Sequence, residues 1–150
     1  MNAESEGELL LVEDNPHDVE LALRALRKAR PILRVQVARD GVEALDYVFG
    51  EGMHAGRGGL ARPSLILLDL KLPKVDGFEV LRCLKADPRT QPIPIVVLTT
   101  SREQRDVCES YRLGVNSYVV KPVDFDRFSL VMLELGSYWL LLNQPPPPGG

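Results

Sequence analysis

Apolar residues occur along this chain either in short continuous runs or in longer stripes with helical spacing. A short run without polar alternation is typical of a strand that is covered on both faces of a parallel sheet. Another segment, Leu33 to Val37, alternates apolar with polar residues and predicts a half-exposed strand at a sheet edge. The continuous runs that predict covered strands are residues 9–12, 64–68 and 93–98, and residues 117–120 predict a further short strand.

Segments with helical spacing separate these strands. A side chain suited to capping precedes most of them, and a glycine-rich stretch at residues 50–62 predicts a long mobile loop. Five strands that alternate with five helices predict an α/β fold, a doubly wound five-stranded parallel sheet with helices on both faces. The predicted caps are Asn15 followed by Pro16, Asp40 with Glu43, Ser101 with Gln104, and Asp124.

The length of 150 residues predicts one domain. We expect a disordered N-terminus at residues 1–7, a globular domain at 8–142 and a Pro/Gly-rich tail at 143–150. The net charge of −3 argues against nucleic acid as a direct partner. No secretory signal pattern and no apolar run of about 20 residues occurs, so we expect a cytoplasmic protein with no membrane partner.

Polar side chains follow four of the predicted strands at the point where each strand ends. Glu13 and Asp14 follow the first strand, Asp69 the third, Thr99 stands at the end of the fourth, and Lys121 follows the fifth. The carboxyl ends of parallel strands meet at one edge of the sheet, where ligands bind in such folds. We therefore expect three carboxylates, a hydroxyl and an ammonium group to converge there.

These residue types suit phosphoryl transfer. Three neighbouring carboxylates repel one another unless a cation neutralises them, and Mg²⁺ accepts carboxylate and phosphate oxygens as ligands. An aspartate is a competent nucleophile for phosphoryl transfer, in which catalysis is mostly positioning and charge neutralisation. Mg²⁺ could bridge Asp14, Asp69 and a phosphoryl group, while Lys121 and Thr99 contact the same phosphoryl oxygens.

The set resembles the receiver domains of two-component response regulators over residues 8–142. That resemblance implies a flavodoxin-like receiver with strand order 2-1-3-4-5. It also implies that Asp69 is the phosphoacceptor for a histidine kinase and that the domain is a signalling protein, not an enzyme acting on other molecules. The matching residues are Glu13-Asp14, Leu67-Leu68-Asp69 with Leu72-Pro73, Asp76-Gly77, Thr99 and Lys121-Pro122.

The resemblance also implies roles at the site. Lys121 would contact the phosphoryl group and form a cis peptide with Pro122, and Thr99 and Tyr118 would form the switch that responds to phosphorylation. The implied Mg²⁺ ligands are Glu13, Asp14, Asp69 and the backbone carbonyl of Lys71. Glu13 stands where the family often has Asp, which leaves open whether it binds the metal directly or through water.

The end of the chain predicts how a signal would leave the domain. Residues 143–150 are too few for an output domain, so we expect output through protein–protein contacts. The last helix has a core-facing stripe at Phe125, Phe128, Met132, Leu135, Trp139 and Leu142. Further apolar residues remain on its other face and predict a two-fold homodimer. These are Leu130, Leu133, Tyr138, Leu140 and Leu141.

The long loop, the absence of an output domain and the leucine-rich last helix resemble the small response regulators that are paired with bacterial phytochrome kinases. A bacteriophytochrome histidine kinase is therefore the implied partner. Two alternatives stay open: a degenerate receiver that is never phosphorylated and acts as an interaction module, and an aspartyl phosphohydrolase. The second is disfavoured because Lys71 stands where such enzymes carry a second Asp.

Overall fold

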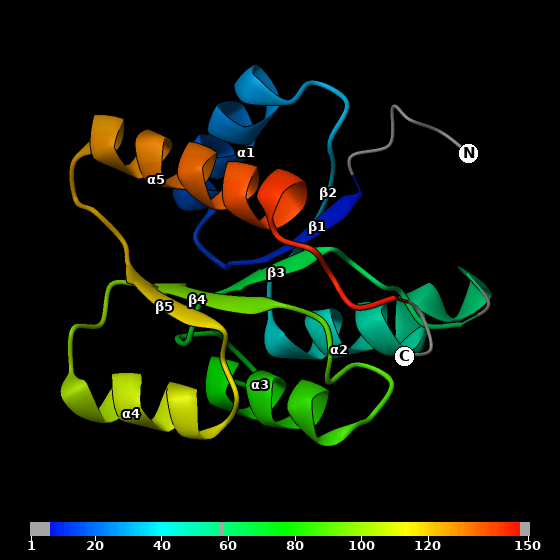
Figure 1. The fold of residues 1–150 in the computed structure, drawn as a ribbon. Helices are drawn as coiled ribbons and strands as arrows, with labels where there is room; N and C mark the ends of the chain where they lie inside the picture. The colour runs from blue at the N-terminus through cyan, green and yellow to red at the C-terminus, as the bar shows by residue number, and fades with distance from the viewer. Residues whose placement is uncertain (1–6, 58, 148–150) are drawn as a thin grey trace.

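A five-stranded parallel sheet forms the centre of the molecule (Figure 1). The structure is a computed structural model that describes residues 7–57 and 59–147. The strand order is β2-β1-β3-β4-β5, which confirms the predicted order and the doubly wound topology. The strands are β1 (Glu8–Val12), β2 (Arg34–Ala38), β3 (Leu65–Leu68), β4 (Ile95–Thr99) and β5 (Ser117–Val120).

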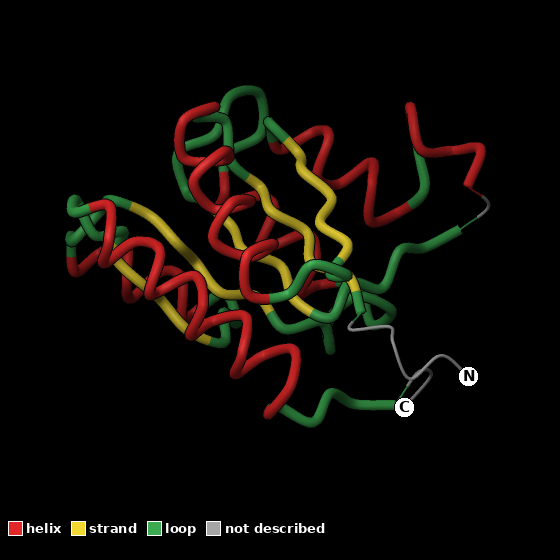
Figure 2. The backbone as a smooth tube through the Cα atoms, turned by 90° about the horizontal axis from the view of Figure 1, so that it is seen from above, coloured by secondary structure: helices red, strands yellow, loops and turns green. Residues whose placement is uncertain are grey.

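Helices cover both faces of this sheet. In Figure 1, α1 and α5 lie on one face and α2, α3 and α4 on the other, and Figure 2 shows the strands running side by side between these layers. Each parallel connection thus crosses over through a helix, as parallel strands require. The helices are α1 (Pro16–Ala29), α2 (Gly41–Phe49), α3 (Gly77–Ala86), α4 (Gln104–Arg112) and α5 (Phe125–Ser137).

Alternate residues of the central strands feed two separate apolar cores. In β1, Leu10 and Val12 pack under α2 and α3, whereas Leu9 and Leu11 pack under α1 and α5. Successive side chains of a strand point to opposite faces, so a strand that is covered twice needs apolar residues at every position. The continuous apolar runs in the sequence have this origin.

The register of the strands aligns their carboxyl ends. Val12 pairs with Leu68 across β1 and β3, and Asp69 continues the ladder by donating its backbone N–H to the carbonyl of Val12 at 3.1 Å. The backbone N–H of Lys121 donates to the carbonyl of Thr99 at 2.7 Å. The residues that follow β1, β3 and β5 therefore lie side by side at one edge of the sheet.

The glycine-rich stretch at residues 50–62 contains a short 3₁₀ helix, η1 (Gly52–Arg57), that the sequence pattern did not predict. Gly50 ends α2 in the left-handed region, with φ 68°. The ring of His54 then packs edge-on against Tyr47, whose hydroxyl donates to Glu8 at 2.5 Å. Aromatic packing thus fixes part of a segment whose composition indicates only a loop.

Two local predictions are wrong. Ser101 does not cap α4, because that helix begins at Gln104 after Glu103 and the hydroxyl of Ser101 donates instead to the carboxylate of Asp106 at 2.6 Å. No peptide bond is cis in residues 7–57 and 59–147, so Lys121 and Pro122 are joined in trans. The trans form is the preferred one even for bonds that precede proline.

The last helix departs from the predicted stripe at both of its ends. Phe128 and Met132 are buried, and Leu135 and Trp139 pack against the same core. Phe125 and Leu142, at the two ends of the stripe, are 48% and 76% exposed and are not core residues. The helix thus extends beyond the sheet that it covers. Its final turn, η2 (Tyr138–Leu142), is a π-helix.

The residues predicted to form a dimer face are only partly exposed. Leu130, Tyr138 and Leu141 are about half exposed, and Leu133 is half-buried. Leu140, predicted to belong to this face, packs partly against the core between α1 and α5. A π-helix has more residues per turn than an α-helix, so its residues are rotated relative to the stripe that α-helical spacing predicts.

Beyond η2, residues 144–147 form neither helix nor strand. Residues 1–6 of the N-terminus predicted to be disordered and residues 148–150 of the predicted Pro/Gly-rich tail lie outside the described residues, as does residue 58. In the parts of the chain that the structure describes, no helix is long and apolar enough to cross a membrane.

Candidate functional site

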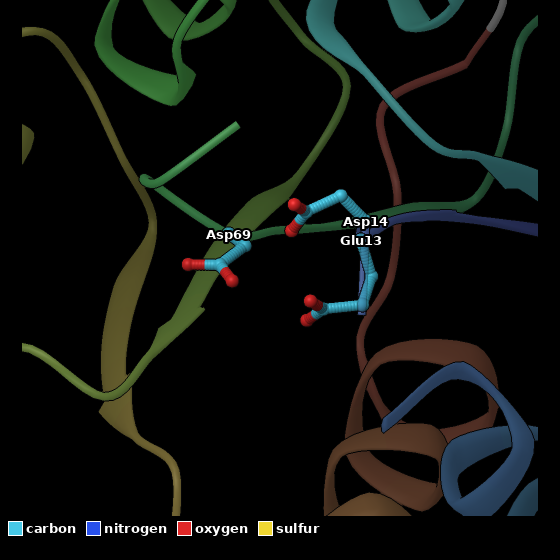
Figure 3. Close-up of side chains that lie close together, drawn as sticks. All are labelled: Glu13, Asp14 and Asp69. Carbon is cyan, nitrogen blue, oxygen red and sulfur yellow. The ribbon is translucent and has the colours of Figure 1, made fainter. Parts of the chain in front are cut away.

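The polar residues predicted to converge do meet at the carboxyl edge of the sheet. Figure 3 shows the carboxylates of Glu13, Asp14 and Asp69 lying close together, with those of Glu13 and Asp14 extending toward Asp69. One oxygen of each carboxylate lies within 4.8 Å of an oxygen of the other two. Glu13 and Asp69 are buried, and Asp14 is exposed. A cluster of this kind offers only hard oxygen ligands, which suit a divalent cation such as Mg²⁺.

The ammonium group of Lys121 lies inside this cluster. Its Nζ donates to Glu13 at 2.6 Å, to Asp18 at 2.9 Å and to Asp69 at 3.2 Å. The Lys121 side chain is 6% exposed. A buried charge is tolerated when it is paired and hydrogen-bonded, and here each of the three ammonium donors has a carboxylate acceptor.

Asp18 is the residue at this site that the sequence reasoning missed. It stands in the first turn of α1, which Asn15 caps by accepting from the backbone N–H groups of His17 and Asp18. An acidic residue in that position is usual because it favours the helix dipole, so Asp18 has no distinctive pattern. Asp14 precedes the cap and is not part of α1, so helical spacing gave no signal that Asp18 faces the same edge.

Local backbone contacts hold the carboxylates in place. The backbone N–H of Asn15 donates to Glu13 at 3.1 Å, and that of Lys71 donates to Asp69 at 3.3 Å. Gly77, at the start of α3, lets the helix approach closely, since a Cβ there would lie 2.4 Å from the carbonyl oxygen of Asp69. A side chain at position 77 would collide with the backbone of Asp69, which explains why the Asp76-Gly77 motif has glycine there. Whether the carbonyl of Lys71 binds a metal stays a prediction.

The electrostatics of the site favour bound cations. Burial raises the pKa of the Glu13 carboxyl to about 7, against the opposing effect of its hydrogen bond with Lys121. Burial alone would lower the pKa of Lys121, but the hydrogen bond to Glu13 and the charges of Asp69 and Glu13 raise it above its usual value. The ammonium thus stays charged, while the carboxylates carry more negative charge than one lysine neutralises.

Thr99 and Tyr118, the predicted switch residues, are linked through Ser101. Thr99 is fully buried, and its hydroxyl accepts from the backbone N–H of Ser101 at 3.4 Å. The hydroxyl of Tyr118 donates to the carbonyl of Ser101 at 3.0 Å. Asp106 holds the Ser101 side chain from α4. The loop after β4 therefore connects the end of β4 to β5 and α4, and the part played by Asp106 was not predicted.

Comparison with known proteins agrees with this geometry. The family model of the response regulator receiver domain matches residues 9–132. Among curated relatives, the probable methanogenesis regulatory protein FilR2 of Methanothrix harundinacea is 43% identical over 99% of this chain and 93% of its own length. The response regulator Rcp1 of Synechocystis sp. is 39% identical over 88% of each chain.

Solved structures of related regulators have the same fold. The Mn²⁺-bound form of Rcp1 superposes with a TM-score of 0.86 at 37% identity, covering 94% of this chain and 99% of its own. The phosphorylated cyanobacterial phytochrome response regulator RcpA gives a TM-score of 0.88 at 40% identity, with the same coverage. The bacteriophytochrome response regulator AtBRR gives a TM-score of 0.72 at 52% identity, covering 92% and 98%. By its matched family model, its topology and these relatives, the chain belongs to the response regulator receiver family.

Proposed function

We propose that Asp69 accepts a phosphoryl group from a histidine kinase and that the chain transmits the resulting change through protein–protein contacts. The observation that carries this proposal is the position of the Asp69 carboxylate, which lies at the carboxyl end of β3 within 3.2 Å of the buried ammonium of Lys121. An aspartate nucleophile needs neighbouring positive charge, because the incoming group brings about 1.5 to 2 negative charges.

The three carboxylates fit a divalent cation, and we assign Mg²⁺ to them. Glu13, Asp14 and Asp69 supply oxygen ligands that come within 4.8 Å of one another, and the carbonyl of Lys71 would add a fourth. When bound, the cation neutralises negative charge on the carboxylates and on the phosphoryl oxygens. The cluster is partly exposed through Asp14, which leaves a side open to a phosphate donor.

Thr99 and Tyr118 are the proposed switch. The Thr99 hydroxyl would donate to a phosphoryl oxygen, which requires it to turn from its present contact with the backbone of Ser101. Tyr118 is tied to the same residue through the Ser101 carbonyl, so a movement of this loop reaches β5. Phosphorylation would thereby shift the arrangement of this loop and of the Tyr118 side chain.

A bacteriophytochrome histidine kinase is the proposed partner. The names of RcpA and AtBRR link those regulators to phytochromes, and both match nearly the whole of this chain. The sequence of the regulator carries no sign of light sensing itself, so the partner is proposed on relatedness alone.

A homodimer through the last helix is proposed as the output surface. Leu130, Tyr138 and Leu141 leave about half of each side chain exposed on α5 and η2, and Leu142 leaves three quarters. Apolar side chains grouped along one helix are a common protein–protein surface. A second copy of the chain offers the same surface, so a two-fold arrangement would cover both.

Phosphorylation by acetyl phosphate tests the central claim. The protein is incubated with acetyl phosphate and Mg²⁺, and its intact mass is measured alongside Asp69→Asn and a sample with chelator. We expect a gain of one phosphoryl group that is lost in both controls. A folded protein that gains nothing under rapid quench would support the phosphorylation-independent interaction module instead.

Sedimentation velocity of the same samples tests the dimer, with Leu130→Glu as the variant expected to be monomeric.

A further inference from the structure

Lys121 uses all of its hydrogen-bonding capacity on three carboxylates. An ammonium group has three donors, and here they go to Glu13, Asp18 and Asp69 at 2.6, 2.9 and 3.2 Å. The acceptors differ in their surroundings, since the side chains of Glu13 and Asp69 are 4% and 10% exposed while that of Asp18 is 23% exposed. The three contacts are therefore not equivalent.

Two of these partners are also the proposed metal ligands. Glu13 and Asp69 belong to the carboxylate cluster, whereas Asp18 does not. A divalent cation held by that cluster would repel the ammonium of Lys121 and would compete for the oxygens of Glu13 and Asp69 that now accept from it. A buried ammonium group that loses its carboxylate partners is an unpaired buried charge, which is energetically unfavourable. The contact with Asp18 is then the one that remains.

We propose that Asp18 is a positioning residue for Lys121, which it holds beside Asp69 while Glu13 and Asp69 turn toward a divalent cation. This inference rests on the proposed function, because it assigns Asp18 to the phosphorylation site. It gives the Asp18–Lys121 ion pair a separate role from the contacts that the same ammonium makes with Glu13 and Asp69.

The surroundings of Asp18 suit this purpose. Its backbone N–H donates to the side chain of Asn15 at 3.2 Å, so the start of α1 fixes its backbone. The helix N-terminus favours its negative charge, and partial exposure keeps the carboxylate hydrated. The contact of the carboxylate with Lys121 therefore does not depend on the residues of the neighbouring cluster.

The effect on phosphoryl transfer follows from geometry. When acetyl phosphate is the donor, an oxygen of Asp69 forms a new bond to phosphorus, the bond from phosphorus to the acetate oxygen breaks, and acetate leaves. Lys121 neutralises phosphoryl oxygens only if its ammonium stays within hydrogen-bonding distance of them. Without Asp18, the flexible lysine side chain would sample other positions once the cation is bound.

The ammonium itself can be observed by NMR without any phosphate donor. Protons of a buried, hydrogen-bonded lysine ammonium exchange slowly with water, so the ¹⁵Nζ–¹H signal of Lys121 reports its confinement. In the wild type we expect this signal with and without saturating Mg²⁺. In Asp18→Asn it should persist without Mg²⁺ and disappear with it. Persistence of the signal in Asp18→Asn with Mg²⁺, or its loss from the wild type, would overturn the inference.

The rate of phosphorylation by acetyl phosphate gives the second measurement. At saturating Mg²⁺, Asp18→Asn should lower the rate about tenfold while leaving the Mg²⁺ dissociation constant within about threefold. Asp18→Glu should restore part of the rate. Glu20→Gln is the matched control, since it removes one charge from the same helix at an exposed residue that pairs only with Arg24 in the described contacts.

A double-mutant cycle separates positioning from a general effect of charge. In a Lys121→Met background, the further change Asp18→Asn should alter the residual rate by less than about twofold, because its target is gone. An equal loss in both backgrounds, or an unchanged rate in Asp18→Asn alone, would overturn the inference. A wild type that accepts no phosphoryl group would contradict the proposed function instead. The NMR result would still show whether Asp18 confines the ammonium of Lys121 when Mg²⁺ is present.

Discussion

Binding of Mg²⁺ at the carboxylate cluster should depend strongly on pH, because burial raises the pKa of the Glu13 carboxyl to about 7. A ligand oxygen binds the cation only when its carboxyl group is ionised, so metal binding must release the proton from Glu13. With this pKa, roughly one tenth of Glu13 is ionised at pH 6 and roughly nine tenths at pH 8. The apparent dissociation constant for Mg²⁺ should therefore fall about tenfold from pH 6 to pH 8.

Titration calorimetry at pH 6, 7 and 8 measures this change. Repeating each titration in two buffers of different ionisation enthalpy counts the protons released. Glu13→Gln is the matched variant, and its weaker Mg²⁺ binding should vary little across the same range. His17, which stands in the first turn of α1, provides a second control. His17→Gln should keep the full pH dependence if Glu13 is its source.

The same group affects the stability of the metal-free protein in the opposite direction. The pKa of Glu13 is raised in the folded state from an ordinary value of 4.5, so the folded protein binds the extra proton and is favoured below that value. This stability is lost as the pH rises from about 4.5 to about 7, by as much as about 3 kcal/mol.

A Mg²⁺ affinity that is equal at pH 6 and pH 8 would refute the reasoning about metal binding, as would a Glu13→Gln variant whose Mg²⁺ affinity keeps the pH dependence of the wild type.

Two further predictions concern the scaffold. Met132→Ala should lower the free energy of unfolding by about 2 to 4 kcal/mol in urea titrations, because Met132 is fully buried between α5 and the sheet. Leu142 is 76% exposed, so Leu142→Ala should change the free energy of unfolding by less than about 0.5 kcal/mol. Gly77→Ala should destabilise the protein and slow phosphorylation, since its Cβ would meet the Asp69 carbonyl oxygen at 2.4 Å, whereas Gly56→Ala has open space and should match the wild type in both assays. In each pair, a control variant that destabilises the protein as much as the test variant would contradict the reasoning from packing.

The strands and the core of the site could be predicted because both follow from rules that act along the chain. Strands that are covered on two faces need unbroken apolar runs. In β1 and β3, the first polar residue after the apolar run marks the end of the strand. Glu13 and Asp69 were identified in this way. A parallel sheet then brings such ends together whatever the sequence between them.

The contacts that could not be predicted are those made across the sheet by ordinary residues. Asp18 is indistinguishable in sequence from any acidic residue in a first helical turn, and its contact with Lys121 spans 103 residues. Ser101 has the pattern of a helix cap, but its hydroxyl donates to Asp106 and its carbonyl accepts from Tyr118 of the neighbouring strand β5. The stripe on the last helix was predicted too long, since a periodic pattern does not reveal where the sheet beneath it ends.

The contacts of Lys121 also bear on how the domain folds. Its bond to Glu13 joins residues 108 apart, and its bond to Asp69 joins residues 52 apart. Contacts of such high sequence separation cost chain entropy early and form late in folding. A chain emerging from the ribosome could therefore form β1 and α1 long before it has an ammonium to offset their carboxylates. The acidic edge would stay loose until the last strand joins, so competence to receive a phosphoryl group would arise only with the final step of sheet assembly.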